Sequence, residues 1–319
     1  MNSGSLRPTL KDVARHAGVS HMTVSRVVTG KQVVSASTAE AVRKSMESLG
    51  YTPDPTLSAL AAYRANKKTH RSDGTGNVIA FLDCDGTDWS QRILGGARVE
   101  ASRLGYSVES FFLSDSRNNM GHMLYHRGVR GLLFGPSDDP QRFDNWDWPK
   151  FAPVSLGALT HEPAMHTVAP DYFSVAFSAC RHLERNGCRR IGFVVRPELE
   201  ARTGHRWLGG YLAATKPPLV FGSDGWGLHN LPDWVDEEKI DGVLTIHSDV
   251  ATALASRKVL PICLNEWDVP ANVLHWKLDP AVIGREGLRL LHHLLLTREF
   301  GLSSTPKSTA LSGKWAMML

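Results

Sequence analysis

The sequence predicts a small all-α head followed by a two-lobed α/β body with parallel sheets. Three observations predict it. Residues 9–51 carry apolar side chains at helical spacing, and the chain from residue 77 alternates short apolar strands with helices. This alternation divides near residue 168 into two similar sets. A chain of 319 residues is long enough for about two domains and a small extra module.

The head is predicted to contain three helices, each preceded by a residue that can cap it. The helices run over 10–16, 21–28 and 36–49, and their caps are Thr9, Ser20 and Ser35. Asp12, at the third helical position, favours a capping box, and Gly18 allows a tight turn between the first two helices. Pro53 and Pro55 then break the pattern, and a basic polar linker follows over 65–76.

The body is predicted from two sets of strands and helices. The strands run over 78–82, 106–113, 131–134, 154–156, 191–195, 242–246 and 260–264. The helices between them run over 93–104, 173–185, 207–214 and 250–255. Such alternation is typical of parallel sheets, and two sets imply two lobes with a cleft between them.

The net charge of +4 is unevenly distributed along the chain. Residues 1–75 carry a net charge of +6, whereas residues 76–319 carry −2. A basic head on a nearly neutral body is typical of a nucleic-acid-binding module, and charge alone leaves a solvated basic tail equally open.

Membrane segments, targeting signals and disulfides are not expected. No apolar run approaches the roughly 20 residues that cross a bilayer, and residues 1–10 lack the apolar region of a signal peptide, so we expect a cytoplasmic protein. The four cysteines form no CxxC pair and are expected to be reduced core residues: Cys84, Cys180, Cys188 and Cys263.

Patterns of catalysis and metal binding are also missing. The sequence contains no nucleophile-elbow, phosphate-loop or zinc-peptidase motif, so we expect no enzyme activity, cofactor or metal. His122 and His126 lie four residues apart without a third ligand, which favours surface or packing roles. Five tryptophans near predicted loop ends can stack on a ligand or pack the lobes, and packing is favoured for most: Trp146, Trp148, Trp226, Trp234 and Trp267.

The stretch from Thr9 to Gly30, TLKDVARHAGVSHMTVSRVVTG, closely resembles the helix-turn-helix of the LacI/GalR (lactose-repressor) family. The resemblance continues through 34–36 and 50–53 to Leu60-Ala61, and phrases such as Arg189-Arg190-Ile191-Gly192-Phe193 are family-like in the body. It implies a helix-turn-helix DNA-binding head with a hinge helix, and a body like the periplasmic binding proteins.

The resemblance also implies where the domains begin and end. The DNA-binding domain is expected over 1–52, the hinge helix and linker over 53–76, and the effector-binding and dimerisation domain over 77–319. The first lobe is expected to comprise about 77–168 and about 280–303, and the second about 169–279 and the C-terminal tail.

In such a head the second helix lies in the major groove, with its first residues at the base edges. The residues expected to contact DNA are Thr9, Ser20, His21, Met22, Thr23, Ser25, Arg26, Leu60 and Ala61. Arg26 suits guanine, Met22 suits a thymine methyl group, and short hydroxyls suit phosphates. Leu60 is expected to wedge into the minor groove, with Leu57 as the alternative wedge.

Residues at strand ends, or aligned with the family's ligand contacts, are expected to bind a small effector. They are Asp83, Asp85, Trp89, Gln91, Ser137, Arg206, Trp207, Asp249 and Asn265. Three places depart from the family pattern. Trp207 aligns with its arginine, one position from Arg206, Ser248-Asp249 stands for its Asn-Asp, and Asn265 replaces its later aspartate.

The resemblance implies a homodimer, with higher oligomers left open, that binds a pseudo-palindromic double-stranded operator and responds to a sugar or sugar derivative. Repression is the family's commoner mode, and activation remains open. The alternatives are a soluble sugar-binding protein without a regulatory role and a sugar-processing enzyme, for which no catalytic constellation appears.

Overall fold

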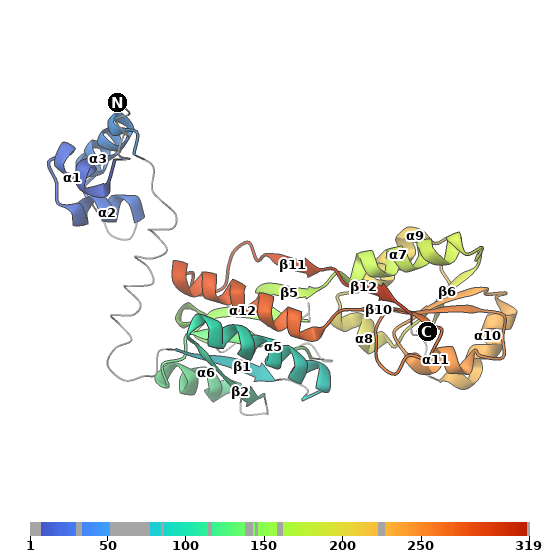
Figure 1. Ribbon diagram of the computed structural model, residues 1–319. Coiled ribbons are helices and arrows are strands. Elements are labelled where there is room, and N and C mark those ends of the chain that lie inside the picture. Colours follow the sequence, from blue (N-terminus) through green and yellow to red (C-terminus); the bar gives the residue numbers. More distant parts are fainter. Residues whose placement is uncertain are drawn as a thin grey trace. The chain divides into compact units, whose positions relative to one another are not determined.

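The computed structural model describes residues 8–29, 34–51, 77–83, 86–113, 117–137, 143, 146–157, 162–222 and 227–317. The chain forms two compact units, 1–69 and 70–319 (Figure 1). The described residues of the first unit form a small helical domain with three helices, and the second unit is an α/β body with two six-stranded sheets, so the predicted fold class is confirmed.

The first unit comprises α1 (Leu10–His16), α2 (His21–Thr29) and α3 (Ala36–Leu49). Its centre is formed by four buried residues: Val13, Ala14, Val24 and Val42. The helix starts are capped as predicted, since the Asp12 carboxylate accepts from the Thr9 N–H at 2.9 Å and Ser20 Oγ accepts from the Thr23 N–H at 3.1 Å. Gly18 has a φ of +63°, which permits the tight turn into α2.

The first sheet of the body is fully parallel, in the order β11-β5-β4-β3-β1-β2. Its strands are β1 (Val78–Asp83), β2 (Ser107–Phe112), β3 (Gly131–Phe134), β4 (Ala152–Leu156), β5 (His166–Pro170) and β11 (Ser308–Leu311). Helices α5 (Asp88–Leu104) and α12 (Pro280–Thr297) pack on one face, while α6 (Arg117–His126) and the short η1 (Trp148–Lys150) cover the other.

The second sheet has the order β12-β10-β9-β8-β6-β7, in which only the β10–β12 pair is antiparallel. Its strands are β6 (Ile191–Val194), β7 (Val220–Phe221), β8 (Gly242–Thr245), β9 (Leu260–Cys263), β10 (Leu274–Lys277) and β12 (Lys314–Ala316). On one side lie α7 (Tyr172–Arg185) and α9 (Arg206–Ala214), and on the other α10 (Leu231–Glu237) and α11 (Ser248–Ala253) (Figure 1). The short elements α8 (Pro197–Arg202) and η2 (Leu228–Asn230) complete this lobe.

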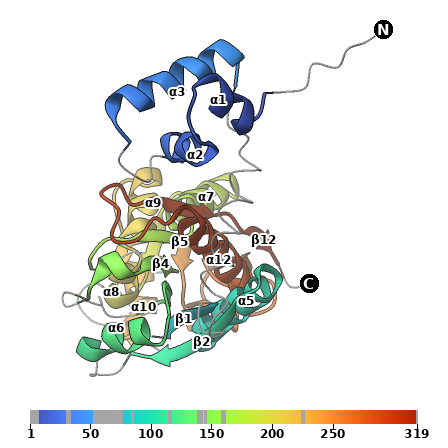
Figure 2. The same cartoon turned by 90° about the vertical axis from the view of Figure 1, so that its left-hand side faces the viewer.

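Helices α5 and α12 lie side by side and approach each other through glycine (Figures 1 and 2). A Cβ added to Gly284 of α12 would lie 1.9 Å from the carbonyl oxygen of Ile93. A Cβ added to Gly96 of α5 would lie 2.0 Å from the carbonyl oxygen of Ala281. Because both obstacles are backbone atoms, this contact requires the absence of a side chain at both positions.

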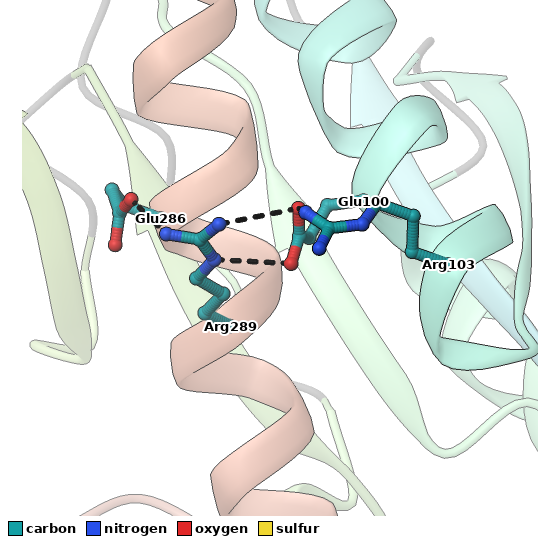
Figure 3. A network of polar contacts seen from close by, with 4 residues as sticks. All are labelled: Glu100, Arg103, Glu286 and Arg289. Carbon is teal, nitrogen blue, oxygen red and sulfur yellow. Dashed lines mark hydrogen bonds and ion pairs between the residues drawn. The ribbon is translucent and has the colours of Figure 1, made fainter.

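An ion-pair network joins the same two helices. Arg289 reaches from α12 to Glu100 of α5, with Nε–Oε1 and Nη2–Oε2 distances of 3.0 and 3.4 Å (Figure 3). Each helix adds one more ion pair to the network. On α12, Arg289 Nη1 lies 2.7 Å from Glu286 Oε1, and on α5, Arg103 Nη1 lies 3.2 Å from Glu100 Oε2. The hydrogen bond from Arg289 lowers the pKa of Glu100, so its carboxylate stays ionised near neutral pH.

The chain crosses between the two lobes three times, and one predicted boundary needs correction. The crossings lie between β5 and α7, between β10 and α12, and between β11 and β12. Since β11 pairs with β5, the first lobe extends to Leu311, beyond the expected limit near 303. The segment 308–311 has no strong apolar pattern because it forms an exposed edge strand, so periodicity could not reveal it.

Other sequence expectations can be compared with the described side chains. Cys180, Cys188 and Cys263 are buried and free. Trp146 and Trp148 stack at 5.6 Å in the first-lobe core, and Trp234 packs against Phe221 at 5.2 Å. Cys84, Trp226, Leu57 and the linker 65–76 lie outside the described residues.

The described part of the chain contains no metal-binding cluster of three or more side chains from His, Cys, Asp or Glu. His122 and His126 lie on exposed positions of α6, with their Nε2 atoms 3.0 Å apart. None of the helices described combines the length and apolar character needed to span a bilayer.

The glycine contact predicts a position-specific effect of added methyl groups. Gly284→Ala should destabilise the body by about 1–3 kcal/mol or more, because its Cβ can be accommodated only if α5 and α12 separate. Gly95→Ala is the matched control: it lies on α5 with nothing within 4 Å of the added Cβ, and should be neutral or stabilising. Urea unfolding of the full chain measures both, and equal stabilities of the two variants would contradict the packing argument.

Candidate functional site: an exposed helix face and a cavity in the body

The exposed face of α2 displays most of the residues predicted at its start. His21, Met22 and Arg26 are exposed, whereas Thr23 and Ser25 are partly buried and Val24 points into the core. Met22 is 63% exposed, which is unusual for a large apolar side chain in a small domain. One side of α2 therefore anchors the helix while the other presents a cation, an imidazole and a thioether.

The side chains on this face are ordered by local contacts. Arg26 Nη2 lies 3.7 Å from Met22 Sδ, one helical turn away. Ser20 and Thr23 join their hydroxyls at 2.9 Å across the first turn of α2. Thr9 is exposed, and its hydroxyl donates to Asp12 at 2.7 Å. Leu60 and Ala61 lie outside the described residues.

The body contains a cavity of about 390 Å³ lined from both lobes. Its polar lining residues are Thr87, Asp88, Arg202, Asn265 and Glu266. Its aromatic lining residues are Trp89, Tyr172, Trp207, Trp267 and Trp276. Its aliphatic lining residues are Pro170, Leu199, Ile246, Leu264 and Leu278. This volume suits a small molecule.

Three of the predicted effector contacts line this cavity: Trp89, Trp207 and Asn265. The lining does not include Asp83, Gln91, Ser137, Arg206 or Asp249. Arg206 and Asp249 are exposed at the starts of their helices, and Ser137 is buried. Asp85 lies outside the described residues.

Asp83 organises the turn before α5. Its carboxylate accepts from Ser90 Oγ at 2.8 Å, from Gln91 Nε2 at 2.7 Å and from the Gly86 N–H at 3.1 Å. Because Asp83 is only 4% exposed, these bonds satisfy its buried charge. Asp83 and Gln91 thus position the start of α5, which carries Trp89 to the cavity.

Several lining residues come from places that strand-end reasoning did not single out. Tyr172 and Pro170 lie at the first crossing between the lobes, and Trp276 and Leu278 at the second. Trp267 follows β9 closely, so its position after a strand was a usable signal. The residues at the crossings have no such sequence signal, because where the chain crosses between the lobes is decided by the pairing of strands in both sheets.

Contacts between the lobes surround the aromatic part of the cavity. Trp89 of the first lobe packs edge-on against Trp267 of the second, with ring centroids 6.3 Å apart. The Arg92 guanidinium lies 4.9 Å from the Trp267 ring centre and 3.7 Å from Glu266. Lys277 approaches the other Glu266 oxygen at 3.0 Å, so this largely buried carboxylate has two cationic neighbours.

A buried carboxyl group supports the wall formed by α8 and α9. Glu200 of α8 is 4% exposed, and its Oε1 accepts from the Leu208 N–H of α9 at 2.7 Å. Its Oε2 is buried without a hydrogen bond among the described residues. Burial raises the pKa of Glu200 to about 7, despite the stabilising bond from Leu208.

This carboxyl group predicts a pH dependence of stability. The raised pKa means that the folded protein holds the proton more tightly than the unfolded chain. The contribution of Glu200 to the free energy of unfolding is therefore complete below about pH 4.5. It falls as the pH rises toward 7 and beyond, by up to roughly 3 kcal/mol. Glu200→Gln keeps an acceptor for Leu208 and should unfold with a flatter pH dependence in this window.

The measurement is urea unfolding of both full-length proteins between pH 4.5 and 8. The gain in stability of Glu200→Gln over the parent should be larger at pH 8 than at pH 5. Parallel stability curves for the two proteins would show that Glu200 ionises normally in the folded state.

Comparison with known proteins identifies the head. Residues 9–54 match the family described as "Bacterial regulatory proteins, lacI family". The HTH-type transcriptional regulator MalR of Streptococcus pneumoniae is 27% identical over 195 residues, covering 58% of this chain and 56% of the relative. The sucrose operon repressor of Shigella flexneri is 29% identical over 210 residues, covering 62% and 58%. The chain thus spans a little more than half the length of these curated relatives.

Solved structures share the fold of the chain. A lac repressor dimer bound to operator and the anti-inducer ONPF superposes with a TM-score of 0.58 at 19% identity, covering 97% of both chains. A complex of the transcriptional regulator CelR with cellobiose gives a TM-score of 0.56 at 20% identity, covering 98% and 99%. The head of the chain is therefore a helix-turn-helix domain of the family of bacterial regulatory proteins named after LacI, and the body shares the fold of the lac repressor.

Proposed function

We propose that this chain is a DNA-binding transcriptional regulator, most simply a repressor, that binds a pseudo-palindromic operator as a homodimer. The observation that carries the proposal is the exposed face of α2, where His21, Met22 and Arg26 project from a helix anchored by Val24. A helix held rigidly by its inner face and capped at its start can enter the major groove without reorganisation.

The side chains of this face suit base edges and phosphates. Arg26 can donate two hydrogen bonds to guanine, and Met22 can pack against a thymine methyl group. The hydroxyls of Ser20, Thr23 and Ser25, with that of Thr9 just before α1, suit phosphate contacts that position the helix. Leu60 and Ala61 are proposed to enter the minor groove as an apolar wedge.

The body is proposed to sense a small molecule in its cavity. Both lobes line the cavity, so a ligand there can favour one arrangement of the lobes over another. The proposed dimer would transmit that preference to its two heads. The lac repressor structure is a dimer bound to operator, which supports the same assembly for this chain. A binding protein without a regulatory role is the alternative, but it gives no reason for the exposed α2 face.

Arg26→Ala tests the proposal. The full chain is first used to select a preferred duplex from a random-sequence library, and affinity for this duplex and for scrambled DNA is then measured by fluorescence anisotropy. The variant should lose about 5–150-fold of its preference for the selected duplex, because a bidentate arginine–guanine contact is worth about 1–3 kcal/mol.

Arg43→Ala is the matched control, since Arg43 is an exposed arginine on α3. Its removal changes the head's charge equally and should leave the ratio of specific to nonspecific affinity intact. The proposal for α2 is wrong if Arg26→Ala keeps its full sequence preference, and the regulator proposal is wrong if the parent chain selects no sequence.

A further inference from the structure

The walls of the cavity are dominated by rings and aliphatic chains. Tyr172 and Trp207 meet edge to face, with ring centroids 4.8 Å apart, and Trp89 and Trp267 form a second such pair at 6.3 Å. Trp276 adds a fifth ring from β10. Ten of the fifteen lining residues are aromatic or aliphatic, so a ligand here meets mainly apolar surface.

Two polar side chains of the wall, Asn265 and Tyr172, already form hydrogen bonds within the protein. The Asn265 amide donates to the Ile246 carbonyl and accepts from the Trp267 N–H at 3.2 Å. The Tyr172 hydroxyl donates to the Gly157 carbonyl at 2.6 Å. Glu266 forms ion pairs with Lys277 and Arg92, but its buried Oε1 has no hydrogen bond among the described residues. Of these three groups only Glu266 Oε1 is left to pair with a ligand, which suits a single donor better than the many hydroxyls of a sugar.

Sugars and aromatic compounds differ in the number of hydrogen bonds with water that they lose on entering such a site. A sugar hydroxyl that leaves water without a new partner costs affinity. A planar aromatic ring instead buries its faces and edges against the tryptophans and leaves few polar atoms unsatisfied. Apolar cavities in proteins bind simple aromatic compounds for the same reason.

We infer that the ligand of this cavity is a small aromatic compound whose ring packs among Trp89, Tyr172, Trp207 and Trp267. The inference rests on the proposed function, in which the cavity is the sensor of the regulator, and it replaces the sugar expected from the sequence. Arg202 and Asp88 also line the cavity, and their opposite charges can select among substituents on the ring.

Calorimetric titration of the full chain tests this class of ligand. The probes are phenol, benzoate and indole as aromatic compounds, and glucose, sucrose and cellobiose as free sugars. At least one aromatic probe should bind saturably with a Kd at least tenfold below that of every sugar. The inference is overturned if a free sugar binds more tightly than all three aromatic probes, or if none of the three binds at millimolar concentration.

Tryptophan substitutions separate ring packing from general stability. Trp267→Leu keeps apolar bulk but removes the ring, and should weaken the aromatic probe at least tenfold. Trp234→Leu is the matched control, because Trp234 packs against Phe221 away from the cavity lining, and it should leave the Kd unchanged. If Trp267→Leu does not fold, Trp89→Leu is used in its place. Unchanged aromatic affinity in the cavity variant would also overturn the inference.

The DNA measurement distinguishes failure of this inference from failure of the proposed function. If the parent chain binds its selected duplex and a free sugar alters that binding while aromatic probes do not, the regulator stands and the aromatic class is wrong. If aromatic probes bind and respond to Trp267→Leu but no duplex is preferred, the ligand class stands and the regulatory role is wrong.

Discussion

The body depends on the close backbone contact between α5 and α12. Gly96 and Gly284 face backbone atoms of the opposite helix at distances that no side chain could occupy, and Arg289 bridges to the buried Glu100 beside them. This contact brings residues 280–297 back onto the first lobe after the chain has built the second. The sheet edge formed by β11 and the second crossing between the lobes both follow from that return.

The cavity is a consequence of these crossings. Tyr172 enters its wall directly after β5, and Trp276 and Leu278 enter it just before α12 begins. Trp89 comes from the start of α5, which the buried Asp83 holds in place through Ser90 and Gln91. The residues that line the cavity are therefore positioned by the same elements that tie the two lobes together, and Arg92 links the lobes directly through Glu266.

The head and the body use polar groups in opposite ways. In the head, capping bonds and a small apolar centre hold α2, which leaves His21, Met22 and Arg26 exposed. In the body, polar groups near the cavity mostly bond to the protein itself, as Asn265, Tyr172 and Glu200 do. The excess positive charge of residues 1–75 and the slightly negative body agree with this division between a surface that presents charge and a cavity that presents rings.

Local sequence signals were sufficient to predict the described helices of the head and several strands of the body. The ranges of α1 and α3 agree with prediction to the residue, because caps and helix-ending glycines act within one turn. β3 was predicted equally well from its apolar run. The cavity could be predicted only in part: Trp89, Trp207 and Asn265 line it, whereas Asp83 at the end of β1 accepts hydrogen bonds from Ser90 and Gln91 of α5 instead. The positions of Tyr172, Trp276 and β11 depend on contacts between segments far apart in the sequence, which form only because the chain crosses between the lobes. The residues next to them in the sequence do not determine these contacts.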